Sequence, residues 1–160
     1  MKTTILSFAT ILLFSFTACG QSGKDVPAPV KTAFSQKFSS AANVKWSMEN
    51  DKEWEAEFKL GGKNYSANFD NAGTWVETEY QISVKEIPAA VKAALDKESA
   101  GAKIKVSEVT ETKDGKSYEF VVGKGENETE LVIDNTGNVL SKEQVKEENE
   151  NDEKEEKEGK

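Results

Sequence analysis

Carboxylates are the most numerous reactive side chains of this chain, and two arrangements of them could bind a cation or transfer protons. Glu53, Glu55 and Glu57 alternate along one face of a predicted strand. Asp70-Asn71-Ala72-Gly73 and Asp134-Asn135-Thr136-Gly137 could be compared with a calcium loop. A calcium loop needs a longer series of oxygen ligands, so turns with Asx hydrogen bonds are the favoured interpretation. We interpret the three glutamates as the solvated face of a half-buried strand.

The chain lacks the side chains on which most enzyme sites depend. It has no histidine, the commonest general base and metal ligand, and its single cysteine is Cys19. An intramolecular disulfide and a cysteine-based zinc site are therefore excluded, and neither G-x-S-x-G nor a P-loop occurs. A formal net charge of −8 argues against nucleic-acid binding. We predict no catalytic, cofactor-binding or metal-binding residue, and an enzyme would need carboxylate-only catalysis.

The first 18 residues have the features of a secretory signal peptide of the lipoprotein type. Lys2 precedes an apolar run over residues 5–16, which is short for a membrane span. The segment Phe16-Thr17-Ala18-Cys19-Gly20 resembles the bacterial lipobox, so we predict lipid modification of Cys19 and a tether over residues 19–25. Ordinary cleavage near Gly20 is the alternative. The expected location is a periplasmic or outer-membrane-anchored lipoprotein of a Gram-negative bacterium, held to the membrane by the lipid only.

Two segments of the chain occur twice in the same order. VPAPVKTAF at 26–34 returns as IPAAVKAAL at 87–95, and DNAGTW at 70–75 returns as DNTGNV at 134–139. Each copy has a helical apolar pattern followed by four segments of strand-like alternation and turn residues. We predict a first α-β repeat at 26–82 and a second at 83–141. The predicted fold is α+β, a tandem duplication of a helix followed by a four-stranded antiparallel sheet, with the helices packed on one sheet face. The two copies either share a continuous sheet or pack face to face.

Residues 142–160 are almost entirely charged or polar. Such a segment buries too little apolar surface to offset the entropy of ordering it, so an acidic disordered tail is predicted. A calcium-binding or partner-binding tail is the alternative.

The leader, the two copies of x-P-A-x-V-K-x-A-[FL] and the D-N-x-G turns together resemble the periplasmic PepSY-like family. These proteins are also described as β-lactamase-inhibitor-like and are common in Bacteroidetes. The resemblance covers about residues 25–142 and implies a duplicated helix-plus-sheet fold. The β-lactamase inhibitor protein places an aspartate-bearing hairpin and a concave aromatic sheet against its enzyme. Its disulfides have no counterpart here, because no cysteine lies within the predicted domain.

Four residues are the candidates for binding under this resemblance. Asp51 lies in a comparable hairpin, and Trp54, Trp75 and Tyr80 could line a sheet. The alternative is that the tryptophans belong to the core and that Tyr80, beside the joint of the copies, is the exposed aromatic. The leading hypothesis is a non-enzymatic envelope protein that binds a protein or peptide. The second is a periplasmic sensor of a small ligand or cation, and an enzyme is the third.

Overall fold

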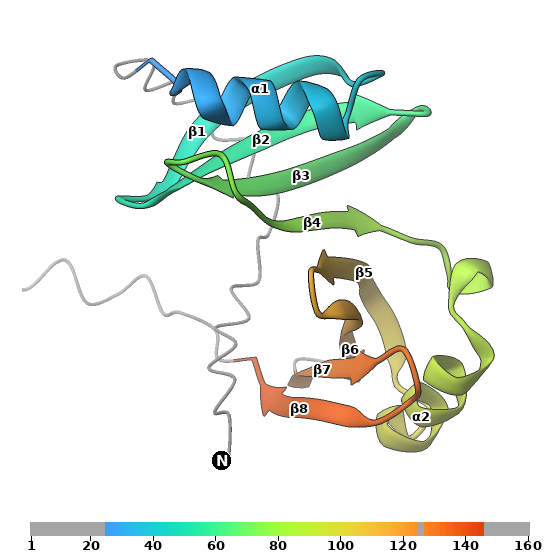
Figure 1. Cartoon of the computed structure of the whole chain (residues 1–160). Helices are drawn as coiled ribbons and strands as arrows, with labels where there is room; N and C mark the ends of the chain where they lie inside the picture. The colour runs from blue at the N-terminus through green and yellow to red at the C-terminus, as the bar shows by residue number, and fades with distance from the viewer. Residues whose placement is uncertain (1–24, 125–126, 146–160) are drawn as a thin grey trace, which may run out of the picture.

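The structure, a computed structural model, describes residues 25–124 and 127–145. These residues form two α-helices, a short 3-10 helix and eight strands (Figure 1). In chain order the elements are α1 (Ala28–Lys37), β1 (Ala42–Asn50), β2 (Glu53–Leu60), β3 (Lys63–Asp70), β4 (Trp75–Gln81), η1 (Val84–Glu86), α2 (Ala89–Ser99), β5 (Lys103–Thr112), β6 (Gly115–Lys124), β7 (Asn127–Asp134) and β8 (Val139–Gln144). The predicted signal peptide and Cys19 lie outside the described residues, as does the predicted tail from residue 146 onward.

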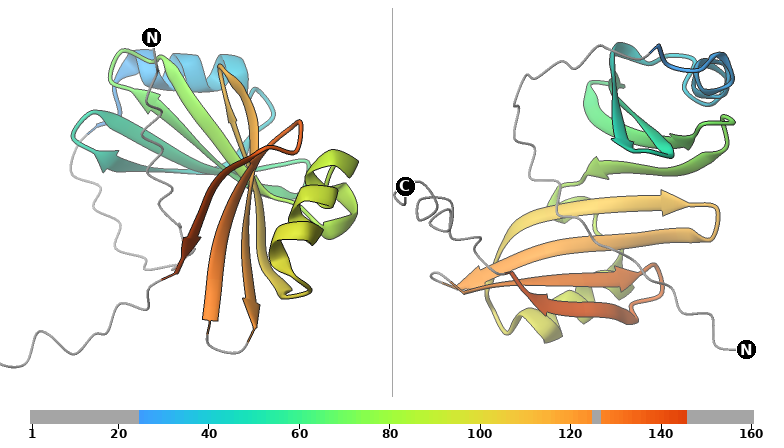
Figure 2. Two further views of the ribbon diagram at one scale, coloured as in Figure 1. Left: turned by 90° about the horizontal axis from the view of Figure 1, so that it is seen from below. Right: turned by 90° about the vertical axis from the view of Figure 1, so that its left-hand side faces the viewer.

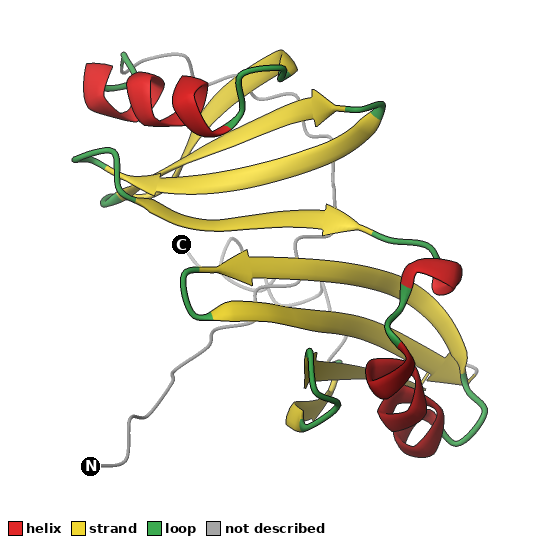
Figure 3. Cartoon of the chain, turned by 45° about the vertical axis from the view of Figure 1, so that its right-hand side comes forward, coloured by secondary structure: helices red, strands yellow, loops and turns green. Residues whose placement is uncertain are grey.

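The eight strands belong to one antiparallel sheet in which each strand pairs with the next strand along the chain. Short turns connect them except between β4 and β5, where the chain passes through η1 and α2 (Figure 3). The predicted α+β fold of tandem helix-plus-four-stranded-sheet units was wrong. In the described residues β4 pairs directly with β5, from Glu77 opposite Thr112 to Gln81 opposite Glu108, so neither half has a sheet of its own. This pairing satisfies backbone N–H and C=O groups that two separate sheets would leave free at their edges.

The two α-helices begin and pack in the same way. Each begins directly after a proline, Pro27 or Pro88, whose fixed φ suits the entry to a helix. Each buries a pair of apolar side chains four residues apart, which therefore lie on one helix face: Val30 and Phe34 in α1, Val91 and Leu95 in α2. After α2 the chain leaves through Ala100 and Gly101, both with positive φ.

Both helices lie over the same face of the sheet, each on its own half (Figure 1). The strand register places one continuous row of side chains on this face: Tyr65, Tyr80, Val109, Tyr118 and Ile133. The first cluster, under α1, consists of the buried residues Val30, Phe34, Trp54, Ala56, Phe58, Ala67 and Phe69. The second cluster, under α2, consists of Ile87, Val91, Leu95, Val109, Tyr118, Phe120, Val122, Leu131 and Ile133. The sheet is continuous, but its apolar core is divided in two.

The two Asp-Asn-x-Gly turns are held by their aspartates. Asp70 Oδ1 accepts hydrogen bonds from the backbone N–H groups of Ala72 (2.9 Å) and Thr74 (2.8 Å). Asp134 Oδ1 accepts the equivalent bonds from the N–H groups of Thr136 (2.8 Å) and Asn138 (2.9 Å). The interpretation of these segments as Asx-type turns is therefore confirmed.

The glycine of each turn touches the first turn of a helix. Gly73 has φ +88, and a Cβ added to it would lie 2.6 Å from the carbonyl oxygen of Pro29 in α1. Gly137 has φ +92, and its added Cβ would lie 2.8 Å from the carbonyl oxygen of Ala90 in α2. Only glycine combines this backbone conformation with so close an approach, so both turns fix the start of a helix against the sheet.

The chain boundaries differ in part from the expected ones. Lys142–Gln144, predicted as the start of the disordered tail, instead complete β8 and pair with Thr129–Leu131 of β7. Lys142 also forms an ion pair of 2.9 Å with Glu98 of α2. The division into repeats at 26–82 and 83–141 stays a prediction. Within the described residues, neither helix has the length and apolar character needed to cross a membrane.

Candidate functional site

The predicted binding residues Trp54 and Asp51 occupy different environments. Trp54 is only 5% exposed and belongs to the first cluster, beneath α1. Its indole N–H donates to Asn71 Oδ1 at 2.9 Å. Asp51 is exposed at the tip of the β1–β2 hairpin, and its backbone oxygen accepts a weak hydrogen bond from Asn71 Nδ2 at 3.5 Å. Asn71 therefore connects the two residues, but they do not share a surface.

The other two candidates, Trp75 and Tyr80, lie on the helix-facing side of β4. Trp75 is half-buried, with Lys37 Nζ 3.5 Å from its ring centroid, a cation–π contact from α1. Tyr80 is half-buried where the two clusters meet, and its ring centroid lies 4.9 Å from that of Tyr65. Lys116 Nζ donates to the Tyr80 hydroxyl at 3.4 Å. The aromatic side of the sheet is thus covered by helices and serves as packing surface.

The opposite side of the sheet, which we call the helix-free face, carries neither described helix (Figures 2 and 3). Its side chains alternate along each strand with those of the aromatic side. They are mainly glutamate, serine, threonine and asparagine, and the strand register places Glu55 beside Asn68, Ser66 beside Glu79, and Glu108 beside Glu119. This face is therefore the large polar surface of the sheet.

Six glutamates form a band across the middle of the helix-free face, which we call the carboxylate band. Its members are Glu55 on β2, Glu77 and Glu79 on β4, Glu108 on β5, Glu119 on β6 and Glu130 on β7. Glu108 and Glu119 lie directly opposite each other in the β5–β6 register. Glu55 is only 7% exposed, so its assignment to a solvated face was wrong. Its neighbours in the register, Ser47 on β1 and Asn68 on β3, flank it on both sides and exclude water.

Partial burial raises the pKa of every member of the carboxylate band. Desolvation is the largest cause, and it raises the pKa of Glu79 to about 8 and those of Glu55 and Glu119 to about 7. Repulsion from neighbouring carboxylates acts in the same direction, from Glu77 on Glu79 and from Glu130 on Glu119. Glu55, Glu79 and Glu119 therefore hold protons near neutral pH, where ordinary glutamates are ionised.

Neutral groups contact the carboxylate band in the part of the chain that the structure describes. The donors are Ser47 Oγ to Glu55 (3.3 Å), Asn68 Nδ2 to Glu77 (3.4 Å), and the hydroxyls of Ser66 and Thr110 to Glu79 (3.5 Å each). The ion pairs among the described residues involve other carboxylates: Glu86, Asp96, Glu98, Glu111 and Glu128. Within this part of the chain, no ion pair therefore compensates ionisation of the band.

Asp70 and Asp134 accept hydrogen bonds within their own turns. The backbone N–H of Thr74 is the main cause that lowers the pKa of Asp70, and the side chain of Asn138 is the main cause that lowers that of Asp134. Among the residues described, no group of three or more His, Cys, Asp or Glu side chains is placed to hold a metal ion.

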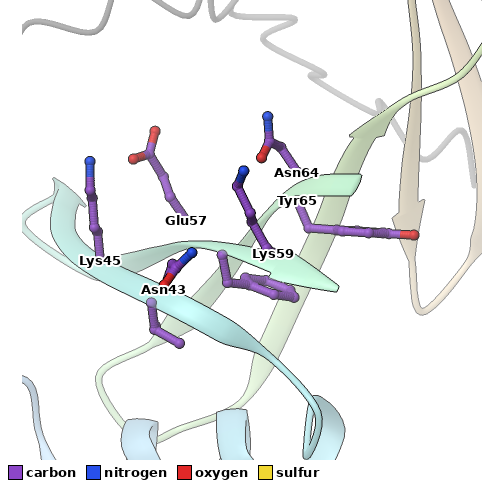
Figure 4. Close-up of a pocket in the computed structure, with 8 residues that line it drawn as sticks. Asn43, Lys45, Glu57, Lys59, Asn64 and Tyr65 are labelled. Carbon is purple, nitrogen blue, oxygen red and sulfur yellow. The ribbon is translucent and has the colours of Figure 1, made fainter. Parts of the chain in front are cut away.

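A shallow pocket of about 570 Å³ lies at one corner of the sheet, where β1, β2 and β3 meet (Figure 4). It is lined by Asn43, Val44, Lys45, Glu57, Phe58, Lys59, Asn64 and Tyr65. Figure 4 shows Lys45, Glu57, Lys59 and Asn64 extending from the same side of these strands. Asn43 has a positive φ of 56, and the β1–β2 register shifts between Ala42 and Lys45, so a β-bulge shapes the pocket.

The sequence contained part of the signal for the carboxylate band. The alternation of Glu53, Glu55 and Glu57 was visible, and so was that of Glu77 and Glu79. Their assembly into one band depends on the β4–β5 pairing, which joins distant segments and has no local sequence signal. The band was therefore missed as a unit.

Several solved structures share this fold. A BLIP-like protein from Bacteroides fragilis has 19% identity and a TM-score of 0.71, with 80% of this chain and 93% of that chain covered. A DUF2874 family protein from Bacteroides ovatus has 22% identity and a TM-score of 0.70, covering 77% and 90%. A protein from Bacteroides eggerthii described as "putative periplasmic" has 20% identity and a TM-score of 0.70, covering 76% and 91%. No curated protein matches the chain.

The family comparison covers more than half of the chain. Residues 52–141, from the β1–β2 turn into β8, match the model of the family described as "Putative beta-lactamase-inhibitor-like, PepSY-like". The matched segment includes both Asp-Asn-x-Gly turns, the β4–β5 pairing and all six glutamates of the carboxylate band. The resemblance inferred from the sequence motifs is confirmed, and this chain belongs to the PepSY-like, β-lactamase-inhibitor-like family.

Proposed function

We propose that the chain is a non-enzymatic protein of the cell envelope that binds another protein or peptide through its helix-free face. The proposal is based on the difference between the two sides of the sheet. One side is covered by α1 and α2 and forms the core, whereas the other carries neither helix and presents ordered polar side chains across its strands. Membership of an inhibitor-like family supports protein binding without catalysis.

The proposed location is the periplasm or the periplasmic side of a membrane. A structural relative is described as periplasmic, and the lipobox-like segment ends at Cys19. A lipid on Cys19 would attach the protein, with residues 19–25 as the tether. Mass spectrometry of the protein from its native membrane tests this, since lipidation adds a defined mass to an N-terminal cysteine. A mature protein that begins after Cys19 would contradict the anchor.

Site-specific crosslinking tests the proposed binding face. Gln81 is exposed on the helix-free face, and Lys97 is exposed on α2. A photoreactive residue at position 81 should give a discrete crosslinked species that unlabelled protein competes away, and the same residue at position 97 should not. No crosslink from position 81, or equal products from both positions, would refute the helix-free face as the binding surface.

The predicted binding residue Asp51 fits the margin of this surface. It is exposed at the β1–β2 hairpin tip, next to Glu53 on the helix-free face. Trp54, Trp75 and Tyr80 would act from the opposite side as support for β2 and β4. A more specific form of the proposal is that the protein inhibits a β-lactamase. Hydrolysis of a chromogenic β-lactam by purified class A β-lactamases, with wild-type protein and the Asp51→Ala variant, measures it directly.

A small-ligand sensor is the second candidate, and the corner pocket between β1 and β3 favours it. The pocket combines the apolar surface of Phe58 and Tyr65 with Lys45, Lys59 and Glu57. A ligand that binds only the native state raises the unfolding temperature by mass action. Thermal-shift screening with peptides, sugars, carboxylates and divalent cations should find such a ligand, and Lys59→Ala should remove the shift. Binding that survives Lys59→Ala and Lys45→Ala would place the ligand elsewhere.

A further inference from the structure

The strand pair β4–β5 is a junction between two separately packed halves. In the described residues it is the pairing that joins the strands packed against α1 to the strands packed against α2 within the one sheet. Its register comprises Glu77–Gln81 opposite Glu108–Thr112. On the helix side Tyr80 of β4 packs against the second cluster and contacts Tyr65 of β3, which packs against the first. The relative rigidity of the two halves therefore depends on a short segment of sheet.

The carboxylate band crosses this junction on the helix-free face. Glu77 and Glu79 lie on β4 and Glu108 lies on β5, with Thr110 donating to Glu79 across the strand pair. Glu79 lies opposite Thr110 and Glu108 lies opposite Gln81, so these two glutamates are diagonal neighbours across the pair, about 7–8 Å apart in ordinary sheet geometry. They repel one another when both are ionised. Partial burial strengthens the repulsion because less water screens it.

No cation among the described residues lies in ion-pair contact with the band to relieve this repulsion. Charged groups also face the band from the surrounding strands. In the first half they are Lys45 and Glu49 of β1, Glu53, Glu57 and Lys59 of β2, and Asp70 at the end of β3. In the second half they are Lys103 of β5, the ion pair of Lys105 with Glu128 of β7, Asp134 of β7, and Glu143 of β8, which lies directly opposite Glu130. Lys45 and Lys59 line the corner pocket, away from β5. The ion pairs Lys63–Glu86 and Glu111–Lys116 lie off this band.

We propose that the β4–β5 junction is a proton-operated hinge: protonation of the carboxylate band holds the two halves together as one rigid sheet, and its ionisation loosens the strand pair. A protonated carboxyl is neutral and can donate a hydrogen bond to a neighbouring carboxyl or carbonyl oxygen, whereas an ionised one only accepts. Ionisation therefore replaces attraction across β4 and β5 with repulsion. The two clusters keep each half folded while the junction opens.

The direction of the pH response follows from the same geometry. Desolvation raises the pKa of Glu79 to about 8, and it also raises the pKa values of Glu77 and Glu108. The folded junction thus binds more protons than the opened one, so its stability falls as pH rises from the ordinary glutamate range through about 8. A change of pH near neutrality would alter both the rigidity of the sheet and the charge of the helix-free face.

Hydrogen exchange measured by mass spectrometry on the full-length protein tests the hinge. After correction for the intrinsic pH dependence of exchange, the amides of β4 and β5 that hydrogen-bond across this strand pair should lose at least about tenfold in protection between about pH 6 and about pH 8.5. The amides of β3 and β8, which lie within the two halves and carry no member of the carboxylate band, should lose much less. Equal loss in all four strands would indicate global unfolding and overturn the hinge, as would unchanged protection of β4 and β5.

A neutral double variant separates ionisation from other effects of pH. Glu79→Gln with Glu108→Gln mimics the protonated state, so β4 and β5 should keep their protection at the higher pH. Asp114→Asn is the matched control, because it removes one exposed carboxylate from the β5–β6 turn and keeps a residue suited to that turn. A double variant that shows the wild-type pH response would overturn the proposal. A double variant that fails to fold would also overturn it, since the neutral state is the one proposed to be rigid.

Discussion

Replacing Gly73 by alanine tests whether the first Asp-Asn-x-Gly turn fixes α1 on the sheet. The methyl group would lie 2.6 Å from the carbonyl oxygen of Pro29 and 2.8 Å from its carbonyl carbon, distances at which the backbone must move. Both the helix start and the turn are held, the latter by two hydrogen bonds to Asp70. Relief of the overlap therefore requires α1 to shift on the first cluster.

The expected loss has two parts that a control can separate. An alanine at positive φ costs about 1–2 kcal/mol of stability, and the overlap with Pro29 adds about 1–3 kcal/mol. Gly62 has nearly the same φ, +84 against +88 at Gly73, and nothing lies within 4 Å of its added Cβ. Gly62→Ala should therefore lose only the first part. The difference between the two variants, about 2 kcal/mol, measures the contact between turn and helix.

Urea unfolding followed by tryptophan fluorescence is suited to this comparison, because Trp46, Trp54 and Trp75 all pack in or against the first cluster. Gly137→Ala should behave like Gly73→Ala, with its loss arising at Ala90 of α2, and far-UV circular dichroism would follow it. Equal destabilisation by Gly73→Ala and Gly62→Ala would refute the reasoning. The loss would then be a matter of backbone conformation alone, and the turn would not position the helix.

Three further predictions concern the core, the turn and the carboxylate band. Phe34→Ala should destabilise by about 3–5 kcal/mol in urea unfolding, because Phe34 packs against the rings of Trp46, Phe58 and Phe69 in a closed cluster. Asn71→Ala removes the acceptor of the Trp54 indole N–H and should destabilise by about 1 kcal/mol. Asn135→Ala is the control and should not destabilise, because Tyr118 stands in the second half at the position that Trp54 has in the first. Glu119→Gln should stabilise the fold by about 1 kcal/mol above pH 8 and should have no effect below pH 4.5. The pKa of Glu119 is raised to about 7, so the free-energy cost of ionising it in the folded state develops as pH rises through that value. Stabilisation by Glu119→Gln that is the same in acid and in base would contradict the assigned pKa.

Local features of the fold were predictable because their signals lie within a few residues. The spacing of Val30 and Phe34 predicts the buried face of α1, and Gly61-Gly62 predicts the β2–β3 hairpin, where both glycines have positive φ. The alternation from Glu53 to Leu60 predicts β2 and identifies which of its side chains enter the core. Each of these predictions depends only on a periodicity of 3.6 or 2 and on turn chemistry.

The single sheet could not be derived from such signals. β4 and β5 are separated in sequence by η1 and α2, and two edge-to-edge halves have the same alternation patterns as two separate sheets. One sheet is favoured over two because pairing of Gln81 and its neighbours with Glu108 and its neighbours satisfies backbone groups that would otherwise be unpaired. The burial of Glu55 could not be predicted from the sequence for a related reason. Alternation identifies its face, but only the neighbouring strands determine how much water reaches it.

The composition of the helix-free face argues that its charge serves a purpose other than stability. Serine, threonine and asparagine occupy neighbouring positions of the same strands, so neutral polar side chains fit this face. A neutral side chain in place of Glu119 would avoid the repulsion from Glu108, its direct cross-strand neighbour. The sequence instead places glutamate at both positions and at Glu79 beside the junction. Groups that are unfavourable for folding and clustered on a sheet face that neither described helix covers are characteristic of functional sites. The helix-free face, and not the aromatic one, is therefore the side of the sheet where the function of this protein should be sought.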